Sequence, residues 1–150
     1  MNHEFLAGDL FLNGHNCAQA VLVAFCDVTG LEPKVAAKLS SSFGGGIGRL
    51  REVCGAVSGM VMAAGLLYGY DDPGMDDAAK KAHYQLVQEL CARFREESGS
   101  IICRELLDNP SADPNPSPRT AEYYKTRPCA RYVMLAARIL DAYIAEHPVP

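Results

Sequence analysis

The stretch FGGGIGRLREVCGAVSGMVMAAGLLYG, residues 43–69, contains a glycine-rich loop followed by a run of small and apolar residues. No charged residue occurs from 53 to 70. We therefore predict a helix over this range that is apolar on nearly every side and buried at the centre of the fold, with Gly55 and Gly59 letting neighbours approach closely. The alternative is a membrane span, but four glycines weaken its hydropathy, so a buried core helix is favoured.

Helical patterns also occur on both sides of this central helix. Capping residues and apolar spacing predict further helices over 16–30, 33–43, 78–98, 101–107 and 128–147. The segment 108–120 holds four of the nine prolines and is predicted to be an irregular surface loop. Runs of alternating β-branched residues bounded by hairpin turns are missing. The prediction is an all-α fold, a compact helical bundle around a Gly/Ala-rich central helix, in a single domain over residues 1–150.

Composition and charge limit the classes of partner. Of the 150 residues, 49% are hydrophobic and 21% are charged, which is the balance of a soluble globular domain. The formal net charge is -4, and the chain lacks the clustered basic surface that nucleic acids or anionic membranes require. Residues 1–16 lack the features of a secretory signal, so we expect a cytoplasmic protein that binds neither nucleic acid nor membrane.

Six cysteines are present, and in a cytosolic chain of this size they indicate metal binding or redox chemistry. No pair forms CxxC, so the reactive set must be assembled across the fold. Four lie at predicted helix N-termini, namely Cys17, Cys54, Cys103 and Cys129. Unpaired N–H groups and the positive end of the helix dipole favour the thiolate there. Cys26, in the last turn of the first predicted helix, and Cys91, on an apolar face, are interpreted as inert packing residues.

Several segments of the chain resemble a bacterial and archaeal family of redox proteins labelled C-GCAxxG-C-C. The matching residues are NCAQAVL at 16–22, the block 43–69, CRELL at 103–107 and PCAR at 128–131. The resemblance spans nearly the whole chain and places the family's four cysteines on Cys17, Cys54, Cys103 and Cys129. It implies an all-helical protein that is redox-active or binds a cluster. Related cysteine domains are joined to cytochromes, which makes an iron–sulfur cluster a reasonable cofactor.

The glycine loop GGGIGRL has two possible uses, to hold phosphate or to present sulfur. A phosphate loop would follow a strand and carry a GK[ST] ending or a GxGxxG with a later acidic residue, and these features are missing. We therefore predict that the loop brings Cys54 to the other cysteine-bearing helix starts. Arg49 and Arg51 could stabilise a nearby thiolate, although arginines beside a turn are more often solvated.

Three hypotheses for function remain open at this point. The leading one is a thiol–disulfide oxidoreductase in which Cys54 is the attacking thiolate and Cys17 resolves the mixed disulfide. The second is a non-catalytic protein whose thiolates at 17, 54, 103 and 129 bind an iron–sulfur cluster or another soft metal. The third is a structural helical module whose cysteines only pack. The expected partner is a redox protein or a small thiol, and a homodimer is left open.

Both redox hypotheses require cysteines that are far apart in the sequence to meet in space. We predict that Cys17, Cys54 and at least one of Cys103 and Cys129 reach a common site at one end of the central helix. Several helix N-termini directed at one place would pool their positive dipole ends and stabilise thiolates that otherwise repel each other.

Overall fold

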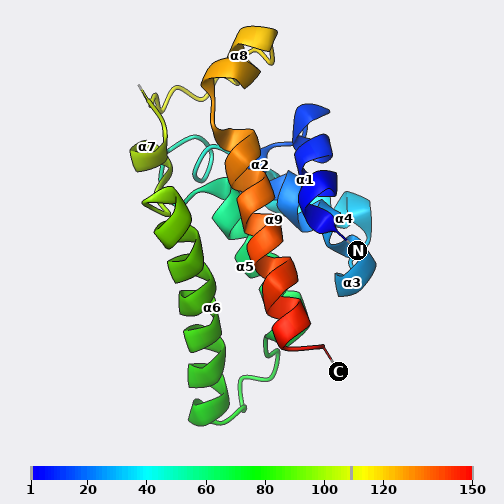
Figure 1. Ribbon diagram of the computed structural model, residues 1–150. Coiled ribbons are helices and arrows are strands. Elements are labelled where there is room, and N and C mark those ends of the chain that lie inside the picture. The colour runs from blue at the N-terminus through cyan, green and yellow to red at the C-terminus, as the bar shows by residue number, and fades with distance from the viewer. Residues whose placement is uncertain (1, 109, 150) are drawn as a thin grey trace.

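The computed structural model describes residues 2–108 and 110–149, and within these ranges it is helical and contains no β-strand (Figure 1). The helices are α1 (His3–Leu12), α2 (Cys17–Ala24), α3 (Cys26–Thr29), α4 (Pro33–Ser40), η1 (Ser41–Phe43), α5 (Gly55–Tyr68), α6 (Asp77–Ser98), α7 (Cys103–Leu106), α8 (Ala121–Thr126) and α9 (Cys129–Glu146). The predicted all-α class is confirmed. In the described part of the chain, no helix is both long enough and apolar enough to cross a membrane.

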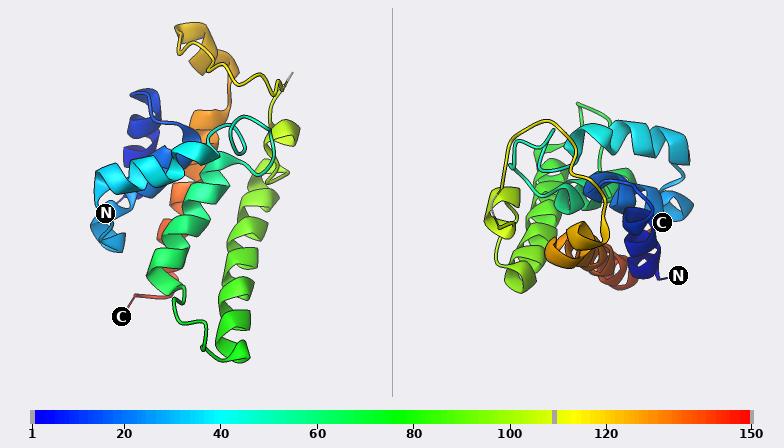
Figure 2. Two further views of the ribbon diagram at one scale, coloured as in Figure 1. Left: turned by 180° about the vertical axis from the view of Figure 1, so that it is seen from behind. Right: turned by 90° about the horizontal axis from the view of Figure 1, so that it is seen from above.

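The long helices α5, α6 and α9 lie side by side, and α1 packs on another flank of α9 (Figures 1 and 2). The loop 44–52, α7 and the proline-rich segment gather at the end of the bundle where α5 and α9 begin (Figure 2). The buried face of α9 carries Val133, Ala136 and Leu140, all fully buried in the core. This arrangement places several helix N-termini at one end of the molecule.

Helix α5 approaches the start of α2 closely because two of its residues lack side chains. A Cβ atom at Gly59 would lie 2.6 Å from the carbonyl oxygen of Ala18, and one at Gly55 would lie 3.1 Å from the Cβ atom of Cys17. These positions are one helical turn apart and so face the same way. The glycines therefore allow the backbone contact that brings Cys17 close to the beginning of α5.

The glycine loop folds back on itself in a left-handed conformation. The amide of Arg51 donates to the carbonyl of Gly45 at 3.1 Å, and that of Glu52 donates to Gly46 at 2.9 Å. Ile47, Arg49 and Arg51 have φ angles of 67, 65 and 64°, a region that costs a non-glycine residue roughly 1 kcal/mol or more. The surrounding hydrogen bonds must offset this strain, which is typical of segments that serve a site.

Backbone contacts then join the loop to α7. Val53 and Ile102 form an isolated antiparallel bridge, the amide of Cys54 donates to Ile101 at 2.8 Å, and that of Cys103 donates to Glu52 at 2.6 Å. Two cysteines from distant parts of the sequence are thus held beside each other by main-chain hydrogen bonds.

The structure departs from the sequence-based expectation in three places. Helices α1 and α8 lie outside the predicted helices. The first predicted helix is interrupted at Phe25, where α2 ends and the short α3 begins. Cys26 is therefore the first residue of α3, and the prediction that it lies in the last turn of one long helix is wrong. Helix α1 gives a weak pattern because apolar residues such as Phe5, which is 63% exposed, lie on its outer face as well as its inner face.

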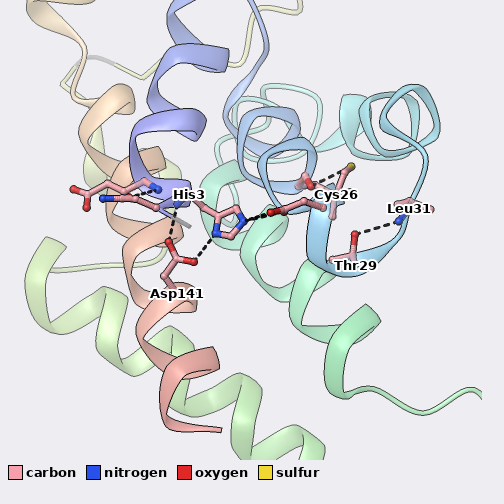
Figure 3. A network of polar contacts seen from close by, with 9 residues as sticks. His3, Cys26, Thr29, Leu31 and Asp141 are labelled. Atoms are coloured by element: carbon pink, nitrogen blue, oxygen red, sulfur yellow. Dashed lines mark hydrogen bonds and ion pairs between the residues drawn. The ribbon is translucent and has the colours of Figure 1, made fainter. Parts of the chain in front are cut away.

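A buried histidine holds α1 in place (Figure 3). The Nδ1 atom of His3 lies 2.6 Å from a carboxylate oxygen of Asp141 in α9, and Nε2 lies 2.8 Å from one of Asp27 in α3. The ring also stacks on Phe25 with a centroid separation of 4.2 Å. Each ring nitrogen lies against a carboxylate, so a single side chain connects three helices.

Candidate functional site

The four cysteines predicted at helix starts line one cavity of about 490 Å³. Cys17, Cys103 and Cys129 are the first residues of α2, α7 and α9, and Cys54 is the N-cap residue of α5. The predicted convergence is therefore confirmed, and it includes both of the cysteines that were offered as alternatives. Cys26 and Cys91 do not line the cavity.

The glycine loop forms one wall of this cavity. Gly46 packs tightly against its neighbours. A Cβ atom added there would lie 2.7 Å from the amide nitrogen of Glu52 and 2.8 Å from the Cβ atom of Cys103. Gly44 lies equally close to Asn16, the residue that caps α2 immediately before Cys17. Glycine at these positions lets the loop pack against two of the cysteine-bearing helix starts.

Arginines of the loop also line the cavity. Arg51 is only 4% exposed, and its guanidinium donates from Nη1 to the sulfur of Cys103 at 3.8 Å and from Nε to the carbonyl of Ser111 at 2.9 Å. Arg49 is half-buried and donates from Nε to the carbonyl of Asp113 at 2.7 Å. The expectation that arginines at this turn are solvated is wrong for Arg51, because the proline-rich segment covers it.

Two further arginines were missed in the sequence. Arg119 donates to the carbonyls of Phe11 and His15 and lies 4.4 Å from the centre of the Phe11 ring. Arg127 lies 5.2 Å from the centre of the Tyr123 ring and donates to Ser117. The position of Arg127, two residues before a cysteine that begins a helix, was an available signal. The position of Arg119, in a loop with no periodicity, was not.

Cys17 and Cys129 form an unequal pair. A hydrogen bond with Cys17 is the main factor that lowers the pKa of Cys129 to about 7, and the positive charges of Arg127, Arg119 and Arg51 lower it further against the opposing effect of burial. The same hydrogen bond, together with burial, raises the pKa of Cys17 well above its ordinary value. Cys17 is thus the thiol that donates, and Cys129 is the thiolate that accepts.

The other two cysteines of the cavity are less acidic than a free thiol. Burial raises the pKa of Cys54 to about 12, although the amides of Val57 and Ala56 act in the opposite direction. Burial also raises the pKa of Cys103, while the hydrogen bond and the charge of Arg51 oppose it. The helix N-terminus favours the thiolate at both positions, but desolvation is the larger effect there. The expectation that Cys54 is the attacking thiolate is therefore not supported by its surroundings.

Comparison with protein families agrees with this arrangement of cysteines. A family model described as "Putative redox-active protein (C_GCAxxG_C_C)" matches residues 15–143. The chain belongs to this family. The match includes the four cysteines of the cavity and the loop that presents them. The searches of curated proteins and of solved structures found no match.

The four cysteines of the cavity are the candidate ligands for the metal or iron–sulfur cluster that the resemblance implies. Among the described residues, no three or more His, Cys, Asp or Glu side chains are grouped so that they could hold a metal ion. The four thiols line one cavity but do not form such a group, and cluster ligation needs several thiolates directed at the same group. The arrangement in this structure does not fit a resident metal centre.

Proposed function

We propose that this member of the C_GCAxxG_C_C family performs thiol–disulfide exchange, with Cys129 as the attacking thiolate and Cys17 as the resolving thiol. The observation that carries the proposal is that Cys17 and Cys129 line one cavity together with four arginines, and that these surroundings lower the pKa of Cys129 to about 7. A nucleophile with a pKa near ambient pH combines a large thiolate fraction with good nucleophilicity.

The reaction begins when the thiolate of Cys129 attacks one sulfur of a disulfide substrate, RSSR. A bond forms between Sγ of Cys129 and that sulfur, the substrate S–S bond breaks, and the first RS⁻ leaves. The sulfur of Cys17 then attacks Sγ of Cys129 and displaces the second RS⁻, which receives the Cys17 proton. The products are a Cys17–Cys129 disulfide, RS⁻ and RSH, so the substrate is reduced by two electrons and the protein is oxidised by two.

Cys54 and Cys103 do not begin the exchange in this proposal. Their raised pKa values keep both as thiols at neutral pH, and they line the cavity beside the reacting pair. All six cysteines are free thiols in the structure, a state that suits a reducing compartment, and we place the protein in the cytoplasm on that ground. The fully reduced protein is the form that starts the reaction.

The test is alkylation of the reduced protein with a small excess of iodoacetamide at pH 7, followed by peptide mass spectrometry. We expect Cys129 to be modified first, and we expect mild oxidation with diamide to produce a peptide crosslinked through Cys17 and Cys129. A Cys91→Ser variant is the matched control, because Cys91 lies outside the cavity. The variants Cys17→Ser and Cys129→Ser should each lose the crosslink.

Two outcomes would contradict the proposal. In the first, all six thiols remain free under the oxidant, which excludes reversible disulfide chemistry. In the second, protein purified without oxygen is coloured and contains iron in proportion to the chain. That result would favour the cluster-binding hypothesis over exchange.

A further inference from the structure

The cavity that contains the cysteines is strongly cationic. Four arginines line it, namely Arg49, Arg51, Arg119 and Arg127, and the described residues of its lining include no Asp or Glu. In the part of the chain that the structure describes, none of these four guanidinium groups forms an ion pair with a carboxylate. This concentration of positive charge occurs in a chain whose formal net charge is -4.

One of these arginines has a donor that the protein does not use. The Nη2 atom of Arg51 is buried and has no hydrogen-bond partner among the described residues, while Nε and Nη1 of the same group are both bonded. Arg51 is 96% buried, since its exposure is 4%, so this donor lacks the bulk water that a surface guanidinium would use. A buried charged donor without an acceptor is costly, so Arg51 is held in the wall of the cavity at the expense of stability.

The positive charges also act on each other. Burial and the charges of Arg51 and Arg127 lower the pKa of Arg49, and Asp113 offsets this effect only in part. Repulsion of this kind is relieved when an anion enters between the guanidinium groups. The Cys129 thiolate supplies one negative charge, which leaves the group of arginines still cationic.

The size of the cavity limits the class of anion. A volume of about 490 Å³ falls within the range of roughly 300–1,000 Å³ that is usual for organic ligands and cofactors. An inorganic oxyanion would fill only a small part of this volume, although Arg49 and Arg127 both donate to the hydroxyl of Ser117 and so lie close together. The planar fork of an arginine is well matched to a carboxylate.

We propose that the substrate of this cavity is a low-molecular-weight disulfide or thiol that carries carboxylates, and that the arginines of the lining bind these carboxylates. This inference rests on the proposed function, because the sulfur of the ligand must lie beside Cys129. The positive charges of these arginines favour such an anion over neutral and cationic disulfides.

Binding is tested separately from exchange with S-methylglutathione, which carries two carboxylates but has no thiol to react. Isothermal titration of the reduced protein should show saturable binding that weakens as salt is raised. The diethyl ester of the same compound, which lacks the carboxylate charges, should bind at least tenfold more weakly. Equal affinity for the two compounds would overturn the proposal, as would inorganic sulfate binding as tightly as S-methylglutathione.

Variants locate the binding site. Arg51→Met and, independently, Arg127→Met should each weaken binding of S-methylglutathione by roughly tenfold or more, as expected for the loss of a charged hydrogen bond. Arg95→Met removes the same charge from an exposed position on α6 and should leave the affinity unchanged. If all three variants bind like the parent protein, the cavity is not the site. The Arg127 variant and the ester comparison keep the test decisive if Arg51→Met does not fold.

Exchange rates separate this inference from the function on which it rests. Glutathione disulfide should oxidise the protein at least tenfold faster than the uncharged 2-hydroxyethyl disulfide or the cationic cystamine. If all three react at similar rates, exchange is supported and the anionic substrate class is wrong. If none reacts although S-methylglutathione binds, the anion site stands and the proposed function fails.

Discussion

Cys17 and Cys129, the first residues of α2 and α9, line the same cavity and shift each other's pKa in opposite directions. The pKa of Cys17 is raised and that of Cys129 is lowered, so a half-buried thiol stabilises a neighbouring thiolate. Helix α9 and the start of α2 contact each other directly, and the pair therefore depends on how these two helices pack.

Removing the donor should make Cys129 less acidic. In Cys17→Ala, we expect the pKa of Cys129 to rise from about 7 toward the ordinary thiol value, because the largest factor that lowers it is lost. The thiolate fraction at pH 7, and with it the alkylation rate, should fall by roughly tenfold. Rates measured from pH 5 to pH 10 give the pKa directly. An unchanged profile would show that the pair does not control the acidity, and Cys91→Ala serves as the control.

Removing an arginine of the cavity should also raise the pKa of Cys129, but by less than removing Cys17 does. Arg127→Met removes a positive charge that lowers the pKa of Cys129, so the midpoint of its alkylation profile should move to higher pH. The exposed Arg95→Met variant should leave the midpoint in place. A shift of the same size in both variants would mean that net charge alone, and not the position of Arg127, determines the acidity.

The glycine loop allows a matched test of close packing. Gly46 and Gly48 both have positive φ angles, of 77 and 54°, but only Gly46 has neighbours within contact of an added Cβ atom. Gly48→Ala should lower the free energy of unfolding by about 1 kcal/mol through backbone strain alone. Gly46→Ala adds a clash with the backbone of Glu52 and with Cys103, and should cost at least about 2 kcal/mol more. Urea unfolding measures both, and equal losses would contradict the packing argument.

The His3 clamp should contribute measurably to stability. His3→Ala leaves the carboxylates of Asp27 and Asp141 without their shared hydrogen-bond partner and should lower the free energy of unfolding by about 2 kcal/mol. Lys34→Ala, at an exposed position of α4, should change it by less than about 0.5 kcal/mol. A double-mutant cycle with Asp141→Asn separates the pair from its surroundings. Strict additivity in that cycle would mean that the contact contributes nothing of its own.

The elements that the sequence predicted best are those with local start and stop signals. Asn16 forms a capping box at the start of α2, Pro33 begins α4, and Gly99 ends α6 in the left-handed conformation. These signals act over one helical turn, so they are readable without the fold. Helix α1 has a capping Asn2 but no single apolar face, and its position depends on contacts of His3 with residues far along the chain.

The sequence by itself determined the helical class and the placing of four cysteines at helix starts, because caps and periodicity are local properties. It could not rank their reactivity. The dipole argument treats the four alike, whereas in the folded chain Cys54 is buried with a pKa of about 12 and Cys129, beside Cys17, has one of about 7. Desolvation, a sulfur from another helix and arginines from distant loops decide this difference, and only tertiary packing sets all three.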